Sequence, residues 1–332
     1  MTNMVKLNPK EDVKRHDFVE KIEMVYGRLP DKPKHLYSKT EKSNINFARG
    51  RASLNEEILI IELENRTLTL PYTSVIPSGG GKYPAIITLE YEKAVPNKYL
   101  PAEEIVDRGY AIFSIHIDDV TKQEKSFKTG ISPYIHSSRR KKSSPGKIAL
   151  WAWAAIRMAE HMSSHDNVDS ERIIISGHGL MARAAMTAAV YYDATSYVIA
   201  NNPSASPTPY CKENPKSGLT VCDFSHLYSP AFAEERDTNE LELLFSALTE
   251  KVLLVGSAEE SDYFCEYKTL INTHKIDEKT PLDSQKASKS KIPTLPYFVR
   301  TNNLSYHIRS GTEYFSREDW NIYLDYIDSK DR

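Results

Sequence analysis

The chain has 332 residues, of which 40% are hydrophobic and 10% aromatic, enough to fill a sizeable core. Its formal net charge of -2 gives no overall attraction to nucleic acid or to an anionic membrane. The three cysteines, Cys211, Cys222 and Cys265, form no CxxC pair, which argues against a disulfide framework or a zinc ribbon. No 18-residue apolar run and no signal-like segment occurs, so we expect a cytoplasmic protein that spans no membrane.

The N-terminal part has its own pattern. Residues 10–26 place apolar side chains at helical spacing, and the proline-containing stretch GRLPDKPKHLYSK follows as an extended connector. We therefore predict an N-terminal helical arm and linker over residues 1–45 and one domain over residues 46–332.

From Glu57 onward, strands and helices alternate. EILIIELEN and TLTLPYTSVIP read as strands with the glycines at 79–81 as their turn, and YPAIITLEY as a strand buried on both faces. Residues 118–147 read as a long polar loop, and residues 276–292 as a polar, mobile one. The alternation predicts an α/β fold with a mostly parallel central sheet and helices on both faces. The last helix should begin at Ser316, with Asp319 completing a near capping box.

The segment ERIIISGHGLMARAAM carries the most specific signal. A strand over Arg172–Ser176 turns sharply into a helix near Leu180, with small residues around the apex. This strand–turn–helix is the form that presents the nucleophile in an α/β-hydrolase. The residue at its apex is Gly179, and we expect it to have a positive φ, since glycine adopts that conformation without steric cost.

Two stretches match a known family. Residues 177–186 read GHGLMARAAM and resemble G-H-S-R-L-G-K-A-A-L, and residues 306–320 read YHIRSGTEYFSREDW and resemble Y-H-x-R-x-G-T-H-Y-F-S-R-E-D-W. Both motifs are those of bacterial carbohydrate esterases of the glucuronoyl-esterase and acetyl-xylan-esterase type. The resemblance runs from about Phe47 to the C-terminus and implies the α/β-hydrolase fold.

The same resemblance shows which functional residues differ. The family's nucleophilic serine is Gly179 here, its oxyanion-stabilising arginine is Leu180, and its histidine base is Glu313. The family's acid falls near Glu259, Glu260 or Asp262, and Glu260 is our candidate for a retained acid. In addition, the stretch NNPSASPTPY has prolines where the family has pocket-shaping glycines. A serine hydrolase needs a hydroxyl, a base and oxyanion donors, so we expect no intact catalytic set.

Substitute chemistries find little support. Ser176 and His178 could form a replacement pair, but we expect Ser176 to end the strand and His178 to face the outer side of the elbow. His178, Glu260 and Glu313 show no metal-binding spacing, so we predict no metal and no cofactor. His307 reads as a structural residue beside the last strand.

The sequence thus predicts a non-catalytic homologue of carbohydrate esterases that serves as a binding or scaffold protein. His178, Glu260 and Glu313 are the candidate binding residues, and we expect a buried Glu313 carboxylate with His178 or an arginine as its partner. The expected partners are a small-molecule or carbohydrate ligand, a second copy of the chain, or an active paralogue; nucleic acid is not expected. The alternative is a divergent hydrolase that uses an unidentified catalytic group.

Overall fold

The computed structural model describes residues 9–136, 140–204, 224–235, 239–261, 263–276 and 295–330. Its strands are β1 (His35–Phe47), β2 (Ala52–Glu62), β3 (Thr67–Pro77), β4 (Tyr83–Glu90), β5 (Ala111–His116), β6 (Val168–His178), β7 (Thr195–Asn201), β8 (Val252–Ala258), β9 (Tyr297–Arg300) and β10 (Leu304–Arg309). Its α-helices are α1 (Pro9–Tyr26), α2 (Ala102–Asp107), α3 (Ile117–Val120), α4 (Ser132–Ile135), α5 (Lys147–Met162), α6 (Leu180–Tyr191), α7 (Pro230–Glu235), α8 (Glu240–Ala247), α9 (Tyr263–Thr273) and α10 (Arg317–Lys330). Within these ranges, no helix is long and apolar enough to cross a membrane.

All these strands form one sheet in the order β1-β2-β3-β5-β4-β6-β7-β8-β10-β9. The central run from β5 to β10 pairs in parallel, whereas the first three strands and β9 join antiparallel. This confirms the predicted α/β fold with a mostly parallel centre. Parallel strands here need helical crossovers, which explains why helices cover both faces.

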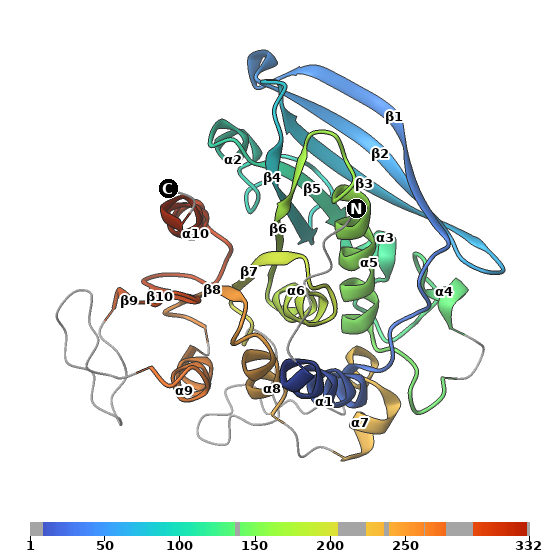
Figure 1. Cartoon of the computed structure of the whole chain (residues 1–332), viewed down its shortest axis with the longest axis vertical. Coiled ribbons are helices and arrows are strands. Elements are labelled where there is room, and N and C mark those ends of the chain that lie inside the picture. Colours follow the sequence, from blue (N-terminus) through green and yellow to red (C-terminus); the bar gives the residue numbers. More distant parts are fainter. Residues whose placement is uncertain are drawn as a thin grey trace.

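Successive side chains of the central strands enter two separate cores. Ile87 and Ile175 point to the face covered by α5, α6 and α8, whereas Ile86 and Ile174 point to the face covered by α2 and α10 (Figure 1). Because neighbouring side chains of a strand alternate between faces, a strand with both faces covered must be apolar throughout. This is the physical reason for the continuous apolar runs of β4 and β6.

The chain joins the sheet earlier than the sequence predicts. Strand β1 starts at His35, inside the segment predicted as arm and linker, and pairs with β2 along most of its length. Nearly every residue of β1 is exposed, so its sequence lacks the alternation that identifies a half-buried strand. Charged pairs across the strands, such as Lys42 with Glu56, take the place of apolar contacts.

Two local expectations need correction. The glycines at 79–81 lie between β3 and β4, whereas β2 and β3 are joined by a short turn in which the Leu63 N–H donates to the Arg66 carbonyl. The turn was misplaced because it contains neither glycine nor proline. The predicted polar loop over 118–147 also contains the short helix α4, while residues 137–139 lie outside the described part.

The helical arm is tied to the body by buried polar contacts. Tyr26 of α1 stacks on Tyr228 and donates to the carboxylate of Glu240, 2.8 Å away. Glu240 also forms an ion pair with Arg183 of α6, and both side chains are almost completely buried. An ion pair this deep is strongly sensitive to loss of either partner, so α1, α6 and α8 hold one fixed arrangement.

One carboxylate organises the C-terminal part. Asp319 accepts hydrogen bonds from His307 Nε2 (2.7 Å), from Arg309 Nε (3.1 Å) and from the Ser316 N–H (2.8 Å). The Asp319 N–H in turn donates to Ser316 Oγ at 3.0 Å, which confirms the predicted capping box. His307 is fully buried. Burial alone would raise the pKa of Asp319, but the His307 hydrogen bond and the charge of Arg309 hold that pKa below its usual value.

We predict that Asp319→Asn lowers the free energy of unfolding by about 3 to 5 kcal/mol, because it leaves the buried Arg309 charge without its anion. Asp325→Asn on the same helix is the matched control. Asp325 is exposed and pairs with Arg108 at the surface, so its change should cost about 1 kcal/mol or less.

Denaturant titrations at pH 7 and at pH 3 give the measurement. Since the folded pKa of Asp319 is lowered, its stabilisation is present above the unfolded pKa and is lost as pH falls through the folded value. The difference between wild type and Asp319→Asn should therefore shrink at pH 3. Equal costs for the two variants at pH 7 would contradict this account of the network.

Candidate functional site

The predicted sharp turn from strand to helix is present at Gly179. Strand β6 ends at His178, α6 begins at Leu180, and Gly179 between them has φ 60° and ψ -122°. The predicted positive φ is confirmed. The turn is also tight on its inner side, because a Cβ placed on Gly177 would lie 2.2 Å from the carbonyl oxygen of Met181. Two glycines therefore meet two separate steric demands, one from the dihedral angle and one from close packing.

A cavity of about 370 Å³ opens beside the elbow. Its walls come from the end of β4 and the segment after it, from the segment after α3, from the elbow and from the segment between β10 and α10. The lining residues are Leu89, Glu90, Tyr91, Glu92, Tyr99, Gln123, His178, Gly179, Leu180, Glu313, Tyr314 and Phe315. The structure thus brings His178, Gly179, Leu180 and Glu313 together around one cavity, named the elbow pocket below. It lies at the carboxyl ends of parallel strands, where α/β sheets usually bind ligands.

His178 lines the elbow pocket, so the expectation that it faces away from the site was wrong. As a neighbour of Ile174 and Ser176 in the two-residue alternation, it points to the α10 face, where its ring stacks on Phe315 at 6.3 Å. Its Nδ1 lies 2.8 Å from Asn201 Oδ1. Because that oxygen can only accept, Nδ1 carries the proton and Nε2 is left as an acceptor. Burial lowers the pKa of His178 and favours this neutral form.

Glu313 is exposed, which corrects the expectation of a buried carboxylate. It lies in the segment between β10 and α10 and lines the rim of the elbow pocket. Glu260 is also exposed, and it does not line the pocket. Its N–H donates to the Gly311 carbonyl at 3.3 Å, so its backbone contributes to holding the segment that carries Glu313.

Ser176 offers no replacement hydroxyl. It is completely buried, does not line the elbow pocket, and its Oγ has no hydrogen-bond partner among the described residues. The described residues also contain no group of His, Cys, Asp and Glu side chains that could hold a metal. Two parts of the predicted site, Asp262 and the proline-rich stretch from residue 205 onward, lie outside the described residues.

Tyr91 is a residue of the candidate site that the sequence reasoning missed. Its hydroxyl donates to the His178 carbonyl at 3.2 Å. Burial raises the pKa of Tyr91, while hydrogen bonds from the backbone of Met181 and Leu180 act in the opposite direction. Both amides therefore lie near the Tyr91 hydroxyl. In an α/β-hydrolase, the N–H of the residue after the nucleophile stabilises the oxyanion, and at the corresponding position here the Leu180 amide lies near the Tyr91 hydroxyl.

Glu90 places a nearly buried carboxyl group in the wall of the same pocket. It is 5% exposed and accepts a hydrogen bond from Thr88 Oγ1 at 2.7 Å. Burial raises the pKa of Glu90 to about 7 against the smaller opposing effect of its hydrogen bonds with Thr88 and Asn97. A strand-end position beside the elbow was the sequence signal that could have identified both Glu90 and Tyr91.

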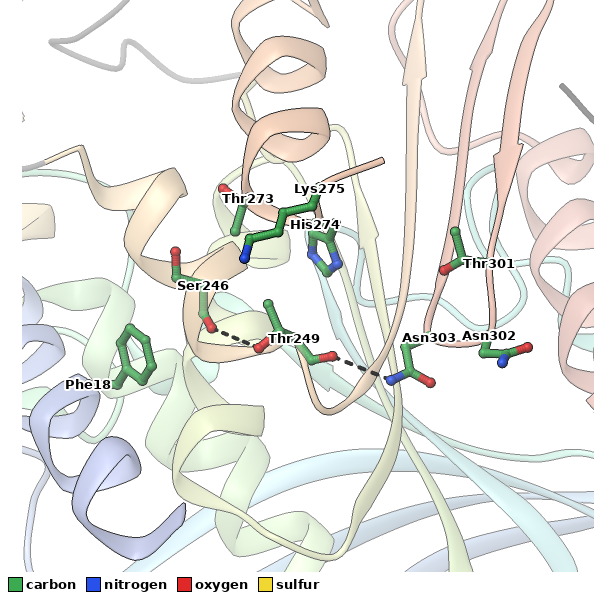
Figure 2. Close-up of a pocket in the computed structure, with 9 residues that line it drawn as sticks. All are labelled: Phe18, Ser246, Thr249, Thr273, His274, Lys275, Thr301, Asn302 and Asn303. Atoms are coloured by element: carbon green, nitrogen blue, oxygen red, sulfur yellow. Dashed lines mark hydrogen bonds between the residues drawn. The ribbon is translucent and has the colours of Figure 1, made fainter. Parts of the chain in front are cut away.

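A second cavity, of about 610 Å³, lies elsewhere on the molecule (Figure 2). Thr249 and Asn303 in its wall precede β8 and β10, and the Asn303 amide donates to the Thr249 carbonyl at 3.4 Å. This cavity is therefore at the amino ends of parallel strands. Although it is larger, it is at the sheet edge where α/β folds seldom bind substrates, and the elbow pocket is the better candidate site.

Comparisons with known proteins agree with this geometry. A family model described as glucuronyl esterase, fungi, matches residues 59–208. A carbohydrate esterase from an unknown prokaryotic organism is 18% identical over 238 residues, which cover 68% of this chain and 55% of that protein. The chain therefore matches about half of the length of this relative.

Solved structures show the same fold. A glucuronoyl esterase from Solibacter usitatus superposes with a TM-score of 0.80 at 18% identity, over 94% of this chain and 91% of that one. A promiscuous CE15 esterase from a marine bacterial metagenome gives 0.74 at 16% identity, over 96% and 91% of the two chains. The resemblance to glucuronoyl esterases is thus confirmed, and the fold is that of the α/β-hydrolases.

We predict that Gly179→Ser lowers the free energy of unfolding by about 1 to 3 kcal/mol, because a side chain must then adopt the positive φ of the elbow. Gly81→Ala is the matched control. A Cβ at Gly81 would make only ordinary contacts with the Tyr83 ring, at 3.8 Å and beyond, so its effect should be small. Thermal and denaturant unfolding of both variants give the comparison, and equal stability of Gly179→Ser and wild type would show that the elbow can relax.

A second prediction concerns pH. Since the folded pKa of Glu90 is raised, its neutral form stabilises the fold at low pH, and this contribution is lost as pH rises through about 7. Glu90→Gln cannot ionise, so it should lose less stability than wild type between pH 5 and pH 8. With about 1.4 kcal/mol for each pKa unit, the difference should be roughly 1 to 3 kcal/mol. If the free energy of unfolding of wild type and of Glu90→Gln changes with pH in the same way, the Glu90 carboxyl group does not have a raised pKa.

Proposed function

We propose that this chain is a non-catalytic carbohydrate esterase homologue that binds a carbohydrate ligand in the elbow pocket. The observation that carries the proposal is the elbow itself: Gly179 has the positive φ of a nucleophile elbow but no side chain, and the Tyr91 hydroxyl donates to the His178 carbonyl at the same turn. The fold has been kept while the groups that perform ester hydrolysis are replaced.

Each requirement of serine-type hydrolysis lacks its group here. Gly179 supplies no hydroxyl, and Leu180 supplies no side-chain donor to a developing negative charge. Glu313 is an exposed carboxylate at the rim, where an imidazole would have to accept the nucleophile's proton. Since nucleophile, base and oxyanion donors act as one unit, replacement of all three removes the mechanism.

An open pocket favours ligand binding over a purely structural role. The elbow pocket remains about 370 Å³ in volume, within the usual range for small-molecule sites. Three tyrosines and Phe315 supply flat apolar surfaces, and Gln123 adds an amide that can both donate and accept. Rings that face sugar C–H groups and polar side chains that pair with hydroxyls are what a carbohydrate site requires. A glucuronoyl esterase from Sporotrichum thermophile binds methyl 4-O-methyl-beta-D-glucopyranuronate in its crystal structure.

The proposal predicts sugar binding without ester hydrolysis. Saturation-transfer NMR with monosaccharides should detect binding to the wild type, and Tyr314→Ala should weaken it by about tenfold through loss of a ring from the pocket. Tyr134→Ala, a change at another exposed tyrosine that does not line the pocket, should have no effect. Acetyl and methyl-glucuronoyl esters should not be hydrolysed above the rate in buffer, with a glucuronoyl esterase as positive control.

Variants that restore the family's catalytic groups serve as an internal control for the hydrolysis assay. The triple change Gly179→Ser, Leu180→Arg and Glu313→His restores the family's groups, and Tyr91→Phe should then raise the rate further because it removes the hydroxyl that lies near the Leu180 amide. One missing oxyanion donor costs about a hundred- to a thousand-fold in rate. Wild-type hydrolysis at the level of the restored variant, or labelling of the wild-type elbow by an organophosphonate, would refute the proposal and favour a divergent hydrolase.

A further inference from the structure

The residues that line the elbow pocket carry negative charge, which disfavours anionic ligands. Glu90, Glu92 and Glu313 all line it, and the described lining contains neither lysine nor arginine. Glu92 and Glu313 are exposed at the rim, whereas Glu90 lies deeper in the wall. A ligand that carries a carboxylate would meet like charge at the rim, and like-charge contacts strongly disfavour the wrong partner.

The aromatic part of the pocket favours the opposite charge. Tyr91, Tyr99 and Tyr314 line the same cavity. A cation within about 6 Å of such a ring is attracted by its quadrupole, more strongly where water is partly excluded. Carboxylates beside aromatic rings are the combination that recognises an ammonium group.

Lys98 shows that the pocket's rim already attracts a cation. Its Nζ lies 4.6 Å from the centroid of the Tyr99 ring and 4.0 Å from the Glu92 carboxylate. Lys98 is itself exposed and does not line the pocket. A cationic ligand would therefore compete with Lys98 for Glu92 and the Tyr99 ring, and Lys98 would not block its entry. Arg309 lies 4.7 Å from the centroid of the Tyr314 ring, and its charge is balanced by the buried Asp319.

We propose that the elbow pocket binds a sugar that carries a protonated amino group, in preference to a neutral sugar or a uronate. The inference rests on the proposed function and adds the ligand's charge to it. The ammonium group would lie between Glu92, Glu313 and the tyrosine rings, while the sugar hydroxyls would contact Gln123 and the Nε2 acceptor of His178. The size of the pocket admits a ligand of about one or two sugar rings.

Calorimetric or NMR titrations with three matched monosaccharides test this at pH 6.5. Glucosamine should bind roughly tenfold more tightly than glucose, and glucuronate more weakly than glucose. Glu92→Gln and Glu313→Gln should each reduce the ratio of glucosamine to glucose affinity by about threefold. Lys98→Gln should increase it, because it removes the competing cation. Glu56→Gln, at an exposed glutamate of the β1–β2 pair, is the matched control and should leave the ratio unchanged.

The outcomes separate this inference from the proposed function. If glucose and glucosamine bind equally, or if glucuronate binds most tightly, the amino-sugar inference is overturned while sugar binding stands. If none of the three sugars binds to folded protein, both proposals fail. If Glu313→Gln and Glu56→Gln reduce the ratio equally, the effect is one of overall charge, and the assignment to the elbow pocket is wrong.

Discussion

The Asp319 carboxylate is the contact on which the candidate site depends. It closes the start of α10, neutralises Arg309 and holds His307, so the last strand and the last helix have one relative placement. The segment between them carries Glu313, Tyr314 and Phe315 into the elbow pocket. Disturbing a buried anion that accepts several hydrogen bonds costs much free energy. The Asp319 network therefore fixes the segment between β10 and α10 as one wall of the elbow pocket.

Gly179 gives the elbow its backbone conformation but no reactive side chain. A nucleophile's backbone is strained for any residue with a Cβ, and glycine removes the strain together with the reactive group. At Gly179 the chain therefore keeps the shape of the catalytic turn at lower conformational cost. The Tyr91 hydroxyl lies at the same turn, where it donates to the His178 carbonyl.

The sequence predicted features that local chemistry determines and missed those that tertiary contacts create. The positive φ of Gly179 and the capping box at Ser316 followed from motifs a few residues long. Tyr91 was missed because His178, whose carbonyl accepts its hydrogen bond, lies 87 residues away in the chain. The exposure of Glu313 was mispredicted for a related reason: a motif places a residue along the chain, but burial depends on what packs over it.

The long strand β1 has a consequence for how copies of this protein behave in a crowded cell. Among the described residues it forms one edge of the sheet, with thirteen residues whose outer backbone groups face no neighbouring strand. An edge of this length is a template for pairing with another chain. Its side chains counter that hazard, because Lys39, Glu41 and Lys42 would bring charges into any new strand pair and leave them poorly hydrated. The absence of apolar alternation, which hid this strand from sequence inspection, is thus also a safeguard against aggregation.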